Sequence, residues 1–352
     1  MRDRAIQIGG RKVGAGQPPF IIAEMSGNHN RSLERALRIV DEAAAAGAHA
    51  IKLQTYTADT MTLDIPDGEF LIRDPESPWD GYTLYDLYDV AHTPWEWHGP
   101  IFERCRELGL ICFSTPFDAS SVDFLESLGV PAYKVASFEN TDIPLLKKVA
   151  STGKPVLLST GMVSVSELVE SVETLRAGGC DDIVLLKCTS SYPAGPEDSN
   201  LLTIPHMRKM FGVQAGISDH TLGIGAALAA VALGATVIEK HFTLRREYGG
   251  VDAEFSMEPA ELRQLCEEAE RAWLSLGRVS YGAWGREKKS PIFRRSLYVA
   301  RDMDEGESFT PDNLRPVRPG FGLPTKHYQD ILGRRIARAA KKGTPVSWEI
   351  IA

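Results

Sequence analysis

The apolar residues of this chain fall into short β-branched runs that alternate with longer segments in which apolar positions recur at helical spacing. We expect strands at FIIAE (20–24), AIKLQTY (50–56), LICFSTPF (110–117), AYKVASF (132–138), PVLLST (155–160), IVLLKCTS (183–190), QAGISD (214–219) and TVIEKHF (236–242). We expect helices over residues 32–46, 95–109, 121–128, 143–150, 164–177, 224–233 and 259–276. Eight β/α units over about 260 residues are typical of a (β/α)8 barrel.

A doubly wound open sheet is the alternative architecture, but no glycine-rich fingerprint follows the first strand.

Two segments of the chain lie outside the repeat of strands and helices. Residues 5–20 predict a small hairpin around Gly9 and Gly10, ahead of the first unit. Residues 57–93 form a long polar and aromatic insertion between the second strand and its helix.

The composition of the sequence changes after Gly277. Residues 278–295 are rich in glycine, proline and charge, which indicates a linker. Residues 296–352 have short β runs and tight turns, with a helix expected only around 327–332. We therefore expect a barrel domain over 1–277, a linker, and a small β-rich domain at the C-terminus.

Composition narrows the functional classes. The formal net charge of −8 argues against non-specific nucleic-acid binding, although it leaves room for a local cationic pocket. The N-terminal residues lack the apolar run of a signal peptide, and no segment reaches the roughly 20 apolar residues of a membrane span. The five cysteines form no CxxC pair, which fits a reducing compartment better than disulfides or zinc. We expect a cytoplasmic protein that binds neither nucleic acid nor membranes.

Two histidines stand at the ends of the last two predicted strands. His220 and His241 close the strands of a predicted strand–helix–strand unit over residues 214–243. Adjacent parallel strands are about 4.8 Å apart, so both imidazoles are brought to one rim, within reach of a single divalent metal. A strand-end histidine can also be packed or solvated without a function. Two in register, with Asp219 beside one of them, leave both interpretations open.

Polar residues also stand at the other predicted strand ends, where a barrel of this type places its chemistry. In chain order they are Glu24, Asn28, His29, Lys52, Gln54, Ser114, Thr115, Lys134, Ser137, Glu139, Ser159, Thr160, Lys187, Ser190, Tyr192, Ser218, Glu239 and Asp252. Burying such groups unpaired costs a few kcal/mol each. Their number therefore indicates a site for a small anionic ligand and a metal.

Lys134 predicts a phosphate cradle, in which short hydroxyl donors surround a cation. The donors are Thr115, Ser137, Ser159 and Ser218. The alternative is that these residues cap the helices that follow, and for Ser114 and Ser164 we favour the cap. Lys52 either binds a substrate carboxylate or neutralises a neighbouring glutamate. By strand parity, Lys240 points away from the adjacent histidine and is expected to be structural.

Ordered motifs along the chain resemble the sialic acid synthase family, which condenses phosphoenolpyruvate with an acylamino sugar. The motifs are AEMSGNHN (23–30), STPFD (114–118), YKVASFE (133–139), LLSTGM (157–162), ISDHTLG (217–223) and IEKHFT (238–243). The tail resembles the antifreeze-like (SAF) domain of that family through VRPGFGLP (317–324). The resemblance to the pseudaminic acid synthase subgroup rests on QTYTADTMTLD (54–64), LYDLYDVAHTPWEWH (84–98), LLKCTSSYPA (185–194) and GVDAEFSMEP (250–259).

The resemblance implies a role for each matching residue. His220 and His241 correspond to ligands of Mn²⁺ or Mg²⁺. The residues that correspond to phosphoenolpyruvate binders are Lys134, Thr115, Ser137, Ser159, Ser190 and Ser218. The residues that we place with the sugar are Lys52, Gln54, Tyr192, Asp252 and Arg318. N-acetylneuraminate synthases typically carry Asn where this chain has Ser190, which alters one phosphate contact and argues against N-acetylmannosamine as the sugar.

Arg318 lies in the tail, and in the family this position reaches into the active site of the partner subunit. The resemblance therefore implies a domain-swapped homodimer, and the length of the linker is compatible with that reach. The expected partners are phosphoenolpyruvate, an acylamino sugar and a second copy of the chain.

The expected function is that of a pseudaminic acid synthase acting on 2,4-diacetamido-2,4,6-trideoxy-L-altrose. C3 of phosphoenolpyruvate attacks the metal-polarised sugar aldehyde, and water adds to C2 before phosphate leaves by C–O cleavage. Glu24, Glu139 and Glu239 are the candidate catalytic carboxylates, and Glu139 is favoured by its place beside Lys134. The alternatives are an N-acetylneuraminate or legionaminate synthase, a non-catalytic sugar-binding or antifreeze-type module, and a Schiff-base aldolase using Lys134 or Lys187.

Overall fold

The computed structural model describes residues 4–75, 77 and 79–352. The chain divides into two compact units, with the boundary between Gly277 and Arg278. Each unit has an apolar core of its own.

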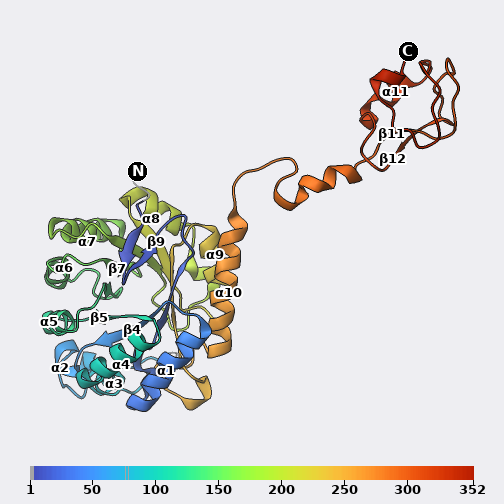
Figure 1. Ribbon diagram of the computed structural model, residues 1–352. Helices are drawn as coiled ribbons and strands as arrows, with labels where there is room; N and C mark the ends of the chain where they lie inside the picture. The colour runs from blue at the N-terminus through green and yellow to red at the C-terminus, as the bar shows by residue number, and fades with distance from the viewer. Residues whose placement is uncertain (1–3, 76, 78) are drawn as a thin grey trace. The chain divides into compact units, whose positions relative to one another are not determined.

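Eight parallel strands of the described chain close into a barrel in the first unit, as the sequence predicts. They are β3 (Phe20–Glu24), β4 (Ala50–Thr55), β5 (Ile111–Pro116), β6 (Tyr133–Val135), β7 (Val156–Ser159), β8 (Ile183–Cys188), β9 (Gln214–Ser218) and β10 (Val237–His241). The strands follow chain order around the barrel, and β10 pairs with β3 to close it. Figure 1 shows helices around the strands of this unit.

The helices of the β/α units cover the outside of the barrel. They are α1 (Leu33–Ala46), α4 (Trp95–Glu107), α5 (Ala119–Ser127), α6 (Ile143–Ala150), α7 (Val165–Ala177), α8 (Thr203–Phe211), α9 (Gly225–Ala232) and α10 (Pro259–Leu276). Helix α8 is absent from the sequence-based expectation. Its buried residues Ile204 and Met207 are three positions apart, so the helical spacing is present in the sequence but brief.

One of the two expected helix caps is wrong. Ser164 does cap α7, where it accepts a hydrogen bond from the backbone N–H of Glu167. Ser114 lies inside β5, with its hydroxyl 2.6 Å from that of Thr55, and it caps no helix. Asp118 caps α5 instead, because its carboxylate accepts two backbone N–H groups of the first turn.

An N-terminal hairpin of β1 (Ile6–Ile8) and β2 (Arg11–Val13) packs against interior residues near the amino-terminal ends of the barrel strands. The shared apolar cluster contains Ile6, Ile8, Val13, Phe20, Ile22, Ala50, Phe113, Ala132, Leu157, Val184, Leu186 and Val237. The amino-terminal half of the barrel is therefore an apolar core, and the polar interior residues lie toward the carboxyl ends of the strands.

The described residues of the insertion at 57–93 form several short elements. These are α2 (Ala58–Met61), a 3₁₀ turn η2 (Gly68–Phe70) and α3 (Leu84–Ala91). An antiparallel bridge joins Leu71 to Thr83, and the hydroxyl of Thr83 caps α3.

The second unit is small and irregular. Its elements are η5 (Gly285–Phe293), β11 (Ser296–Val299), β12 (Leu314–Val317), η6 (Thr325–His327), α11 (Tyr328–Ile331) and η7 (Trp348–Ile350). The segment expected as a linker thus contains a 3₁₀ helix, and the short helix expected near 327–332 is α11. Leu297, Phe309 and Val346 are among the buried residues in the core of the second unit.

Across the described parts of both units, no helix combines the length and the apolar character that crossing a membrane requires.

Candidate active site

Strand register gathers the predicted residues at the carboxyl ends of the barrel strands. His241 lies beside Glu24 across the β10–β3 pair, and Glu239 lies beside Ser218 across the β10–β9 pair. Glu24 also lies beside Lys52 across the β3–β4 pair. Because alternate residues of a strand face the same side, Glu239 and His241 share the interior face of β10.

A buried charge network fills the interior below the histidines. Lys52 Nζ lies 2.6 Å from Glu24 Oε2 and donates to the hydroxyl of Thr115 at 2.9 Å. Lys52 Nζ and Lys134 Nζ each lie 3.9 Å from Glu239 Oε1. Lys52 therefore neutralises a neighbouring glutamate, which is one of its two predicted roles. Two cations and two carboxylates compensate one another where an isolated charge would be too costly to bury.

The carboxyl groups of the site have different pKa values. Burial raises the pKa of Glu24 to about 7, against the opposing effect of Lys52. Burial likewise raises the pKa of Glu139 to about 7, against the effect of Lys134. For Glu239, burial is outweighed by the two lysines, so its pKa is below the usual range. The site thus combines a carboxylate that stays ionised with groups that exchange protons near neutral pH.

Of the residues predicted for the phosphate cradle, Ser137 and Ser190 meet at Gly161, where the loops after β6, β7 and β8 converge. Ser218 instead donates to Glu239 Oε1 at 3.0 Å. The backbone N–H of Gly161 donates to Ser137 Oγ at 3.0 Å. A Cβ atom at Gly161 would collide with Ser190 Oγ and lie 2.8 Å from Ser137 Oγ, so the absent side chain permits this approach. Ser159 Oγ is buried and has no hydrogen-bond partner. Lys134 Nζ makes one hydrogen bond, to Val135 O at 3.0 Å.

The two histidines face each other at the barrel mouth. The ring centroids of His220 and His241 are 5.3 Å apart. His220 Nδ1 lies 2.8 Å from Thr189 O, which fixes the ring. Burial lowers the pKa of His220, but Cys188 and the Thr189 carbonyl outweigh it, so the pKa of this imidazole is raised. Burial, with His220 next, lowers the pKa of His241 well below its usual value. A neutral imidazole is the form that binds a metal.

These donors fit a divalent cation. His241 Nδ1 and Glu239 Oε2 are buried without hydrogen-bond partners. Among the residues that the structure describes, no group of three or more His, Cys, Asp or Glu side chains is arranged to hold a metal. A cation held here would have two imidazole ligands from the protein, and water or substrate would have to complete its coordination.

Asp252 closes one side of the histidine pair. Its Oδ2 lies 3.8 Å from His241 Nδ1 and accepts a hydrogen bond from the hydroxyl of Ser26. Ser26 has φ +49°, and Asn30 and Arg31 in the same loop have φ +47° and +55°. Three non-glycine residues in the left-handed region within six positions are costly, and such strain clusters at functional sites.

An aromatic cluster surrounds the imidazoles. The ring of Tyr192 lies 4.4 Å from that of His220 and 5.2 Å from that of Phe255. Phe255 also lies 5.0 Å from His241. Trp79, in the insertion, lies 5.8 Å from Tyr192. The sequence analysis named Tyr192 but missed Phe255 and Trp79, because neither stands at the end of a strand.

Cys188 is a further interior residue that the sequence analysis missed. Burial raises the pKa of its thiol, but hydrogen bonds to His220 and Ser137 and the charge of Lys134 bring it down to about 7. The alternation of the β8 strand contains the signal: Val184, Leu186 and Cys188 share one face, and the first two lie in the barrel core.

Other predicted strand-end residues do not join this cluster. Lys187 lies on the opposite face of β8, and its Nζ donates to Cys188 O at 2.7 Å. Asn28 Nδ2 is bonded to Phe242 O and to the hydroxyl of Ser256. His29 is packed at 5.4 Å from Trp97. The amide of Gln54 donates to Glu24 Oε1 at 3.0 Å and does belong to the site.

Lys240 is structural, as strand parity predicts. Its buried Nζ lies 2.9 Å from Asp219 Oδ2 and donates to two backbone carbonyls of the turn after β9. This pair fixes the turn that carries His220. Arg318 lies in the second unit and directly follows β12.

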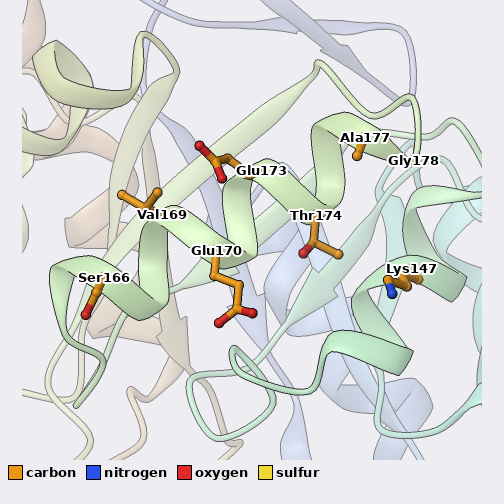
Figure 2. Close-up of a pocket in the computed structure, with 8 residues that line it drawn as sticks. All are labelled: Lys147, Ser166, Val169, Glu170, Glu173, Thr174, Ala177 and Gly178. Carbon is orange, nitrogen blue, oxygen red and sulfur yellow. The ribbon is translucent and has the colours of Figure 1, made fainter.

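The helices outside the barrel carry a separate groove of about 580 Å³. Figure 2 shows its lining side chains, which include Lys147 of α6 and Ser166, Glu170 and Glu173 of α7. Figure 2 also shows the carboxylate of Glu170 and the amine of Lys147 projecting from different helices. None of the predicted site residues lines this groove, so size alone does not locate the chemistry.

A (β/α)8 barrel with a lysine and hydroxyl cradle beside two imidazoles at its mouth defines a barrel enzyme for an anionic substrate. Sequence comparison gives the family. The chain belongs to the NeuB family, whose profile matches residues 39–281, and a SAF domain profile matches residues 294–352. The predicted resemblance to the sialic acid synthases is confirmed.

Individual relatives agree with this assignment. The pseudaminic acid synthase of Campylobacter jejuni subsp. jejuni serotype O:2 is 42% identical over 92% of this chain and 94% of its own length. The N,N'-diacetyllegionaminic acid synthase of Legionella pneumophila is 36% identical over 96% of each chain. The crystal structure of an N-acetylneuraminic acid synthetase from Leptospira borgpetersenii, in complex with citrate, has a TM-score of 0.72 and 35% identity, and the match covers 82% of this chain and 95% of that chain. The chain is therefore an enzyme of the nonulosonic acid synthase class.

Proposed function

We propose that this nonulosonic acid synthase makes pseudaminic acid, by condensing phosphoenolpyruvate with 2,4-diacetamido-2,4,6-trideoxy-L-altrose and releasing phosphate. The observation that carries the proposal is the shared barrel mouth, in which the cradle around Lys134 adjoins the pair His220 and His241. Cys188 relates the two halves, since His220 of the pair and Ser137 and Lys134 of the cradle all lower the pKa of its buried thiol. One ligand with an anionic end and one with an aldehyde oxygen suit such a site.

Phosphoenolpyruvate would occupy the cradle. The groups that we assign to it are Lys134, Thr115, Ser137, Ser159, Ser190 and Ser218. Lys134 supplies the cation, and its Nζ has donor capacity beyond its bond to Val135 O. The buried hydroxyl of Ser159 lacks a partner in the protein, so a ligand oxygen would satisfy it.

His220 and His241 would hold a divalent cation, Mn²⁺ or Mg²⁺. When bound, such an ion supplies Lewis acidity to a carbonyl oxygen. The protein orients the two rings through Thr189 O at His220 and through Asp252 beside His241. Lys52, Gln54, Tyr192 and Asp252 would contact the sugar, with Arg318 contributed by the tail.

The proposed condensation forms one carbon–carbon bond and consumes one water molecule. C3 of phosphoenolpyruvate bonds to the sugar aldehyde carbon, whose oxygen gains a proton. Water adds to C2, and the C2–O bond to phosphate then breaks. We assign water activation to Glu139, because its Oε2 is buried without a partner and its pKa is near 7. The ionised Glu239 lies where it can stabilise positive charge at C2.

A sister activity, the synthesis of legionaminic or N-acetylneuraminic acid, is the second candidate. Identity to the pseudaminic acid synthase of Campylobacter jejuni is 42%, compared with 36% to the legionaminic acid synthase of Legionella pneumophila. Ser190, in place of the asparagine that N-acetylneuraminate synthases typically carry, also favours the first candidate.

The assembly would be a homodimer in which Arg318 of each tail completes the site of the partner subunit. The SAF domain profile supports this proposal, since it matches residues 294–352 and Arg318 lies within that range. Five free cysteines suit a reducing compartment, which supports a cytoplasmic location.

A sugar panel tests the function. Purified protein is incubated with phosphoenolpyruvate, Mn²⁺ and one of three sugars: the diacetamido-trideoxy altrose, an epimeric diacetamido sugar, or N-acetylmannosamine. We expect fast phosphate release with the first, and loss of release with chelator or in His220→Ala, which should fold normally. Faster release with another sugar would transfer the assignment to the sister activity. Full activity of His220→Ala in chelator would defeat the proposed chemistry.

A further inference from the structure

The insertion at 57–93 delivers one indole, that of Trp79, to the aromatic cluster beside the histidines. Trp79 Nε1 donates to Val251 O at 2.8 Å. Its ring centroid lies 5.8 Å from that of Tyr192, which in turn lies 4.4 Å from His220. Val251 directly precedes Asp252. One side chain thus joins the insertion to the loops that follow β8 and β10.

Local contacts hold the indole in this place. The backbone N–H of Trp79 donates to Ser77 Oγ at 3.2 Å, and its carbonyl accepts from Tyr82 N at 3.1 Å. An antiparallel bridge also joins Leu71 to Thr83. The bonds of Trp79 restrain its backbone and its indole, which lowers the entropic cost of using the indole as a binding surface.

The same indole lines a pocket of about 500 Å³. Tyr82, Val90 and Val251 complete an apolar part of the lining, while Arg31 and Glu254 add charge. A pocket in which apolar and aromatic side chains stand beside a few polar and charged groups is typical of a small-molecule subsite. Nothing in the bond-making chemistry requires such a pocket, so its use should be sought in substrate selection.

We propose that Trp79 determines sugar specificity, by packing its indole on the apolar substituents of an N-acylated deoxy sugar held at Tyr192. This inference rests on the proposed function and names the surface that would select the sugar. The acyl methyl group and the C6 methyl group of a diacetamido-trideoxy sugar are the apolar substituents concerned. The pocket lined by Trp79 and Val251 receives one acylamino group.

The physical basis is the difference between methyl groups and hydroxyl groups against an aromatic wall. A methyl group gains contact with the ring, and each methyl or methylene in an apolar pocket changes discrimination by roughly 10–200-fold. A hydroxyl in the same place loses water without gaining a hydrogen bond. Trp79 therefore favours a deoxygenated, doubly acylated sugar over N-acetylmannosamine.

The test compares Trp79→Ala and Trp79→Phe with wild type, using W273F on helix α10 as the matched control for loss of an indole. We expect Trp79→Ala to raise KM for the diacetamido sugar at least about tenfold. KM for phosphoenolpyruvate should stay within twofold. The preference for this sugar over N-acetylmannosamine should fall by a similar factor, and Trp79→Phe should fall between the two. Equal losses with both sugars, or a matching rise in KM for phosphoenolpyruvate, would overturn the proposal.

A binding measurement separates this inference from the proposed function. The reduced, open-chain diacetamido sugar is titrated while tryptophan fluorescence is recorded. We expect a change in wild type and W273F that is lost in Trp79→Phe. If wild type turns over no sugar of the panel but shows this Trp79-dependent change, the function fails and the binding surface stands. If turnover occurs and the fluorescence change persists in Trp79→Phe, the surface fails and the function stands.

Discussion

Glu24 and Glu139 have similar pKa values, but Glu24 is in direct contact with a lysine. Burial raises the pKa of each to about 7. Glu24 is held by Lys52 at 2.6 Å and by Gln54 at 3.0 Å. Glu139 Oε2 is buried without a hydrogen-bond partner. A carboxyl group used for proton transfer must exchange partners during the reaction, which favours Glu139 over Glu24.

The raised pKa of Glu139 predicts how activity depends on pH. If its carboxylate activates water, kcat should fall as the pH is lowered through about 7. Glu139→Gln should lower kcat by roughly 10²–10⁴-fold and abolish this limb of the profile, while Glu139→Asp keeps the limb. Phosphate release measured between pH 5.5 and 8.5 gives the profile. Glu170→Gln, on the outer surface of α7, is the control, and an unchanged limb in Glu139→Gln would assign the proton transfer to another group.

Stability provides an independent check of the same residue. The folded-state pKa of Glu139 lies above the ordinary value of 4.5, so the folded protein holds this proton more tightly than the unfolded chain. Its contribution to stability is complete below pH 4.5 and is lost as the pH rises to about 7. The Tm of Glu139→Gln should therefore decline less than that of wild type across this range.

Strand parity predicts which residues of a known strand face inward, and it succeeds for Glu239 and Ser218. It could not predict that Glu24 would be tied to Lys52, since that depends on which side chains meet across the barrel. It also misses Trp79, because the approach of the insertion to the β10–α10 loop is a tertiary contact with no local pattern.

At the scale of elements, the loops after β6, β7 and β8 can meet because Gly161 has no side chain. The loop after β7 donates its Gly161 N–H to Ser137 of the loop after β6. Ser190, after β8, occupies the space that a Cβ at Gly161 would need. The sequence predicted the three strands, but the requirement for glycine follows only from the distance between their loops.

Gly161→Ala should therefore damage phosphoenolpyruvate binding more than folding. The added methyl displaces the hydroxyls of Ser137 and Ser190, and a misplacement of about 1 Å can cost about 10²-fold. We expect KM for phosphoenolpyruvate to rise at least about tenfold, with KM for the sugar nearly unchanged. Gly99→Ala on α4, where a Cβ meets nothing within 4 Å, is the matched control. Wild-type kinetics in Gly161→Ala would show that this contact does not shape the cradle.

At the scale of the whole molecule, the barrel holds every proposed site residue except Arg318. That residue belongs to the compact unit that starts at Arg278. The sequence predicted both units from their composition and periodicity. The proposed homodimer rests on the family resemblance, because neither composition nor periodicity specifies which surfaces of two chains would meet.

A complementation experiment tests whether each site is shared between two chains. Arg318→Ala leaves a normal barrel with a defective tail, and Glu139→Gln leaves a normal tail with a defective barrel. Each variant alone should be nearly inactive. In a domain-swapped heterodimer, the intact barrel of one chain receives the intact tail of the other, which restores one of the two sites. Mixing after reversible dissociation should therefore recover about a quarter of wild-type phosphate release, because about half of the dimers are mixed. Recovery should require the exchange of subunits, so mixing without dissociation is the control. If Arg318 instead serves the barrel of its own chain, every mixed dimer carries two defective sites and no activity returns.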